Sequence, residues 1–152
     1  MPVKDPQQLN DAQDIVFADP AYKPKGDETF CNLATQDVLH RLGYDGLKGM
    51  TADQMCEFVF SSKDWLIKPM ADAQGLANEG VILIALLSSQ RLGQSHGHVV
   101  SLTTGQGDFS GKWNCKTPFC MNIGRAGTLF RARGINWAFQ IPPDIYALVS
   151  TL

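Results

Sequence analysis

The sequence predicts an α+β fold in which N-terminal helices pack on a central antiparallel sheet. Two observations support this. Apolar residues recur every three or four positions up to about residue 61, and short, largely apolar runs typical of strands follow residue 80. A chain of 152 residues that is 44% apolar and 18% charged is ordinary for a globular protein with one sizeable core. We therefore expect residues 1–152 to form a single domain.

The clearest helix is predicted for residues 30–42. Its apolar side chains form one stripe, made of Phe30, Leu33, Ala34, Val38 and Leu42. Asp27 or Thr29 can cap the start of this helix, and Gly43 is placed to end it. This segment is also the one that carries the candidate nucleophile described below.

Three further helices are expected. Residues 6–17 have a proline at the first turn, and residues 70–78 can add a short helix. Another helix begins at Thr51, where Thr51 and Gln54 have the spacing of a capping box.

The second half of the chain has the pattern of strands. Residues 81–87 are wholly apolar, as expected of a central strand, and residues 98–102 form the next one. Further strands are expected at residues 119–123, 135–141 and 145–149, separated by turns rich in Gly, Pro and Arg. Helices followed by strands in this order favour an antiparallel sheet.

Charge and hydropathy argue against several classes of function. The formal net charge of −2 does not suit nucleic-acid binding, which needs a basic surface. The longest apolar run, residues 81–87, is too short to span a membrane, and the polar N-terminus does not resemble a signal peptide. We expect synthesis in the cytoplasm, so that any target outside the membrane requires delivery by another system.

Cys31 is the candidate nucleophile. It falls in the first turn of the predicted 30–42 helix, where backbone N–H groups are unpaired and the helix dipole is positive. Both features favour the thiolate, which is the reactive form of cysteine. A cysteine placed there for packing alone is the competing interpretation.

His98 is the candidate base. It begins a predicted strand, and a strand-borne histidine that faces a helix N-terminus has the geometry of a Cys–His pair. His96 is the alternative, but it lies in a loop rich in Ser and Gly. A solvent-exposed strand histidine without a catalytic role is the simpler interpretation of His98.

A third group must orient the imidazole. We expect Asn122, on the next strand, to lie beside His98 and to accept a hydrogen bond from its distal nitrogen. Asn114 and Asp108 are the alternatives. The oxyanion would be bound by the backbone N–H of Cys31 and by a second donor, for which Tyr22 is the candidate.

The order of these features resembles the NlpC-type branch of papain-like cysteine peptidases, and is similar to CHAP amidases and to amidase effectors of type VI secretion. The likeness rests on residues 27–39, 80–102 and 120–124, and the chain has the length of one such domain. The family more often has a small residue after the cysteine and His as the third group, where this chain has Asn32 and Asn122.

The resemblance implies a peptidoglycan hydrolase that cleaves amide bonds in stem peptides, with no metal or cofactor. It implies action at the bacterial cell wall or periplasm after delivery by a phage or a secretion system. An immunity or inhibitor protein is a further partner that it allows, and a monomer is expected. Arg125, Arg131 and Arg133 could bind acidic stem peptides or could form a solvated loop.

Two alternatives use other residues. His96, His98, Cys115 and Cys120 could form a zinc site in a non-enzymatic module, although their spacing is not the usual one. A structural role, for example in a phage particle, is the other alternative. Cys115 and Cys120 could also form a disulfide in an oxidising compartment, or could remain two thiols.

Overall fold

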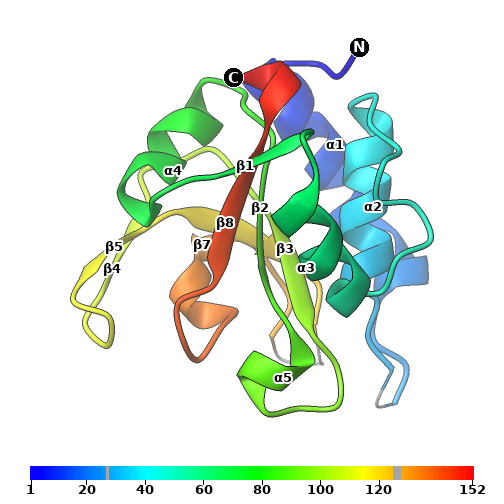
Figure 1. The fold of residues 1–152 in the computed structure, drawn as a ribbon, viewed down its shortest axis with the longest axis vertical. Coiled ribbons are helices and arrows are strands. Elements are labelled where there is room, and N and C mark those ends of the chain that lie inside the picture. Colours follow the sequence, from blue (N-terminus) through cyan, green and yellow to red (C-terminus); the bar gives the residue numbers. More distant parts are fainter. Residues whose placement is uncertain (27, 125–127) are drawn as a thin grey trace.

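The computed structural model describes residues 1–26, 28–124 and 128–152. These residues form a mixed α+β fold around an antiparallel six-stranded sheet with the strand order β1-β8-β2-β3-β6-β7 (Figure 1). A separate hairpin joins β4 to β5. The helices are α1 (Pro6–Ala18), α2 (Cys31–Arg41), α3 (Ala52–Ser61), α4 (Met70–Asn78) and α5 (Ser89–Leu92). The strands are β1 (Trp65–Ile67), β2 (Leu83–Leu87), β3 (His98–Leu102), β4 (Asp108–Ser110), β5 (Cys115–Thr117), β6 (Phe119–Asn122), β7 (Phe130–Gly134) and β8 (Asp144–Leu148).

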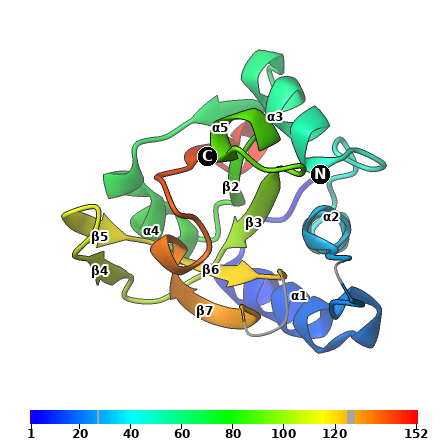
Figure 2. The same cartoon turned by 90° about the horizontal axis from the view of Figure 1, so that it is seen from below.

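The central strands of the sheet are buried on both faces, which explains why β2 is apolar throughout. Ile84 and Leu86 belong to the core formed with α1, α2 and α3. Leu83, Ala85 and Leu87 point the other way, into a second core formed with α4 and the segment after β7. Figure 2 shows α1, α2 and α3 on one side of the sheet and α4 with the β4–β5 hairpin on the other. The fold thus has three layers, and the alternation of side chains along β2 connects them.

The helical predictions are confirmed in place and extent. The predicted capping box at the start of α3 is present, with the Thr51 hydroxyl bonded to the Gln54 N–H and the Gln54 side chain bonded to the Thr51 N–H. The predicted cap of α2 is wrong in one respect, because Phe30 occupies the N-cap and makes no side-chain capping bond. Thr29 therefore does not cap this helix, and Asp27 lies outside the described residues.

Three of the predicted strands are present as β2, β3 and β6, and β8 covers the one expected at residues 145–149. The strand predicted at residues 135–141 is wrong. Residues 135–137 form a 3-10 helix instead, and the strand that pairs with β6 precedes it as β7. The short strand β1 and the β4–β5 hairpin were not expected.

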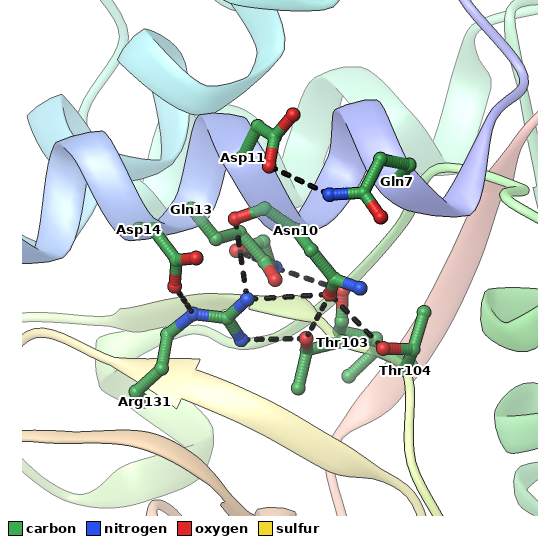
Figure 3. Close-up of polar contacts among 10 residues, drawn as sticks. Gln7, Asn10, Asp11, Gln13, Asp14, Thr103, Thr104 and Arg131 are labelled. Carbon is green, nitrogen blue, oxygen red and sulfur yellow. Dashed lines mark hydrogen bonds and ion pairs between the residues drawn. The ribbon is translucent and has the colours of Figure 1, made fainter.

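A cluster of polar side chains ties α1 to the sheet (Figure 3). The Arg131 guanidinium on β7 bonds to Asp14 Oδ1 (2.8 Å), Thr103 Oγ1 (2.6 Å) and the backbone and side-chain oxygens of Asn10. Gln13 donates to Ser101 Oγ and to the Leu102 carbonyl on β3. These bonds fix β3 at its end remote from His98, and they show that Arg131 has a structural role.

None of the helices in the described part of the chain is both long enough and apolar enough to cross a membrane.

Candidate active site

Cys31 is the first residue of α2, and it is almost fully buried, with 7% of its surface exposed. The first backbone bond of this helix runs from Ala34 N–H to the Phe30 carbonyl, so the N–H groups of the first turn have no helical acceptor. Because the N-cap offers no side-chain oxygen either, these groups are available to Cys31 and to a substrate.

Strand pairing explains how His98 and Asn122 meet. β3 and β6 are antiparallel, with Ser101 opposite Met121 and Leu102 opposite Cys120. Continuing this register puts position 100 opposite Asn122. His98 lies two residues further along the same face, as a diagonal neighbour of Asn122. The pairing of β3 with β6 thus explains how two residues that are far apart in sequence come into contact.

Asn122 holds the imidazole of His98 in one orientation. Its Oδ1 lies 2.6 Å from His98 Nε2, and its Nδ2 donates to the Thr128 carbonyl at 2.7 Å. Since the amide donor is bonded to Thr128, Oδ1 must accept, and His98 Nε2 must carry the proton. The other ring nitrogen, Nδ1, is then the one that faces Cys31, with which the His98 side chain forms a hydrogen bond.

The charges of the pair follow from these contacts. Burial alone would raise the pKa of the Cys31 thiol, but the hydrogen bond and charge of His98 and the N–H groups of Val99 and Asn32 lower it below its ordinary value. Burial would lower the pKa of His98, whereas the bonds to Cys31 and Asn122 raise it. Both directions favour a thiolate–imidazolium pair, which is the reactive state of a cysteine nucleophile.

Phe139 packs on the imidazole and was not anticipated from the sequence. The two ring centroids are 5.0 Å apart and the rings are tilted by 54°. Phe139 is itself buried, so it covers one side of the imidazole. Packing against a fixed ring favours a fixed orientation of His98.

Two clefts meet at this pair. The first, called here the Cys31-side cleft, has a volume of about 520 Å³ and is bordered by residues 28–32, 51–53 and 96–97. The second, the His98-side cleft, has a volume of about 390 Å³ and reaches from His98 and Asn122 to residues 136–140. Thr29, His96 and Gly97 border both. The pair therefore lies between two concave surfaces, as a groove for an extended substrate requires.

The structure does not bring Tyr22 into this group. Its hydroxyl donates to Asp37 Oδ2 at 2.8 Å, six residues beyond Cys31 on α2. Burial, followed by the bond to Asp37, raises the pKa of Tyr22 to about 12. Tyr22 borders neither cleft, so the expectation that it serves as an oxyanion donor is corrected.

The other candidates are also placed. Asp108 lies on β4 and Asn114 in the β4–β5 turn, and neither borders the clefts. His96 borders both clefts, but the hydrogen bond to Asn122 belongs to His98. The structure thus brings Cys31, His98 and Asn122 together, while their catalytic roles stay predictions.

The four residues of the predicted zinc site do not converge. Among the described residues, no group of three or more His, Cys, Asp or Glu side chains is arranged to hold a metal ion. Cys115 contacts the Met70 sulfur at 3.8 Å, whereas Cys120 is buried in the core beside α4. All four cysteines are free thiols in the structure.

Comparison with known proteins finds neither a family model nor a characterised protein that matches this chain. The assignment of a function therefore depends on the geometry of the site.

Proposed function

We propose that this chain is a papain-like cysteine hydrolase that cleaves amide bonds in peptidoglycan stem peptides. The observation that carries the hydrolase proposal is the arrangement of Cys31, His98 and Asn122, in which the amide fixes the imidazole tautomer and the imidazole lowers the pKa of the buried thiol. The choice of peptidoglycan rests on the order of the sequence features, which resembles cell-wall amidases.

The reaction begins with attack of the Cys31 thiolate on the carbonyl carbon, which forms a C–S bond and an oxyanion. In the proposed mechanism the backbone N–H of Cys31 donates to this oxygen. The hydroxyl of Thr29, a residue that borders both clefts, is proposed as the second donor. When the C–N bond breaks, His98 gives its proton to the leaving amine, and a thioester remains.

In deacylation His98 acts as a base, whereas in acylation it acted as an acid. His98, now neutral, takes a proton from a water molecule that attacks the thioester carbonyl, and the C–S bond breaks to restore the thiolate and release the acid. Asn122 accepts from Nε2 throughout, so the ring presents Nδ1 to each reacting atom in turn.

Digestion of purified peptidoglycan tests this proposal. The wild-type chain and Cys31→Ala are incubated with the same sacculi, and the soluble fragments are identified by mass spectrometry. We expect fragments that are shortened at one stem-peptide amide bond, and none with the variant. Fragments cut within the glycan strand, or equal release by the variant, would contradict the proposal. The proposed place of action is the bacterial cell wall, reached by delivery with a phage or a secretion system.

A further inference from the structure

The two clefts beside the catalytic pair differ in charge. Glu28 and Asp53 border the Cys31-side cleft, which has no Lys or Arg among its described lining residues. Lys112 borders the His98-side cleft, and none of the described residues lining that cleft is acidic. The groove is therefore negative on one side of the reacting atoms and positive on the other.

A second cation contacts a residue of this cleft without lining it. The Arg133 guanidinium stacks on the ring of Trp137, 4.2 Å from its centroid. Trp137 borders the His98-side cleft and is 55% exposed, whereas Arg133 is not among the residues that line the cleft, so Lys112 is the cation that borders it. Lys112 comes from the β4–β5 turn, with its ammonium 5.6 Å from the Trp113 ring centroid.

The mechanism says which part of the substrate occupies each cleft. The acyl carbon bonds to Cys31, and the leaving nitrogen must lie within hydrogen-bond reach of His98 to receive its proton. The acyl part thus extends into the Cys31-side cleft and the leaving amine into the His98-side cleft. A carboxylate on the acyl side would meet Glu28 and Asp53, whereas one on the leaving side would meet Lys112.

We infer that Lys112 recognises a free carboxylate on the leaving-group half of the substrate. This inference rests on the proposed amide hydrolysis and adds its specificity: the bond that is cut precedes an amino acid whose carboxyl group is unblocked. Lys112 acts here as a binding residue, and its ammonium is expected to lower KM and to leave kcat unchanged.

Paired synthetic substrates test the inference. Two stem peptides are compared that differ only in the carboxyl group of the leaving residue, which is free in one and a carboxamide in the other. For the wild type we expect kcat/KM about three- to tenfold higher on the free acid, as for one partly solvated ion pair. Lys112→Met should remove this preference through KM, and Lys116→Met, outside the cleft on β5, should keep it. A preference for the carboxamide, or one that Lys112→Met leaves unchanged, would overturn the inference.

A second measurement separates this inference from the proposed function. Iodoacetate and iodoacetamide alkylate thiolates and differ mainly in a carboxylate, so their rate ratio at Cys31 reports the charge of the site without any peptide. Lys112→Met should lower the ratio of iodoacetate to iodoacetamide rates, and Lys116→Met should not. If neither peptide is cleaved, the proposed function fails, and the alkylation ratio alone then tests whether Lys112 forms an anion site. A lower ratio in Lys112→Met but not in Lys116→Met supports the anion site. An unchanged ratio in Lys112→Met overturns it.

Discussion

Cys31 and Cys120 are both buried, on opposite faces of the same sheet, and their thiols differ in acidity. Burial raises the pKa of Cys120, and no charged partner among the described residues offsets this effect. Burial acts in the same direction on Cys31, but His98 and two backbone N–H groups outweigh it and lower the pKa. The comparison teaches that the partners of a buried thiol, and not its burial alone, decide whether its pKa is raised or lowered.

Substitution of the two cysteines should give opposite results. We expect Cys31→Ala to lower hydrolysis by at least about a thousandfold while the fold stays intact, because the covalent nucleophile is lost. Cys120→Ala should retain the wild-type rate but reduce the free energy of unfolding by about 1 kcal/mol, through a small loss of core packing. Turnover and thermal unfolding of both variants check this. Full activity in Cys31→Ala would remove the basis of the mechanism.

Removal of the imidazole should make Cys31 resemble Cys120. In His98→Ala the pKa of Cys31 should rise to that of an ordinary thiol or above, so that alkylation by iodoacetamide at pH 7 slows by about thirtyfold or more. His96→Ala is the matched control, since His96 borders the same clefts without the bond to Asn122. If His96→Ala is the slow variant, the base has been misassigned.

Asn122 should have a smaller effect, because it carries no charge and acts on the ring through one hydrogen bond. We expect Asn122→Ala to lower the rate by roughly ten- to a thousandfold, the cost of one well-placed catalytic bond. Asn122→Asp should be tolerated better, since a carboxylate accepts the same proton and stabilises the imidazolium. Steady-state kinetics of the two variants measure the difference. Wild-type activity in Asn122→Ala would show that the ring is oriented by other contacts.

The smallest effect is expected at Asp53, which positions the loop before His98. Its carboxylate accepts from the Ser89 N–H (2.7 Å) and hydroxyl (2.5 Å). A Cβ on Gly97 would lie 2.7 Å from Asp53 Oδ1, so that the chain leading to His98 runs directly against this group. Asp53→Ala should lower kcat by about three- to tenfold with KM nearly unchanged, the loss expected for one or two hydrogen bonds acting indirectly.

Asp72→Ala is the control for Asp53, because Asp72 also lies in the first turn of a helix and loses the same interaction with the helix dipole. Asp53→Asn keeps an acceptor for Ser89 and should restore most of the rate. Equal losses in Asp53→Ala and Asp72→Ala would indicate a general loss of stability and no effect on His98.

Much of the fold could be predicted because its signals are local. The apolar run of β2 follows from burial on both faces, and the capping box of α3 from the spacing of Thr51 and Gln54. The missed strands lack such signals. β7 contains two arginines, and it pairs at the edge of the sheet through its backbone while Arg131 is neutralised by Asp14. No sequence pattern predicts the ion pair between Arg131 and Asp14, because the two residues lie far apart in the chain.

The residues of the site also divide into those with a local sequence signal and those without one. Cys31 and His98 could be singled out because a helix start and a strand start are visible in the sequence. Tyr22 was misplaced because proximity in sequence to the α2 helix does not fix the direction of a loop side chain, which here turns to Asp37. Phe139 and Lys112 could not be found at all, since each reaches the site through tertiary packing of segments with no catalytic pattern.

The central claim is that His98 keeps Cys31 in its thiolate form, and the pH dependence of alkylation tests it most directly. The rate constant for iodoacetamide at Cys31 is measured from pH 3 to pH 10 in the wild type and in His98→Ala. A lowered thiol pKa predicts that the wild-type rate rises to its plateau at a lower pH than an ordinary thiol does, since the thiolate forms as pH rises through that pKa, and that in His98→Ala the rise moves to alkaline pH. Peptide cleavage should fall again as pH rises through the raised pKa of His98, because the neutral ring has no proton for the leaving amine. A wild-type alkylation rate that rises only above about pH 8, as for a free thiol, would contradict the account.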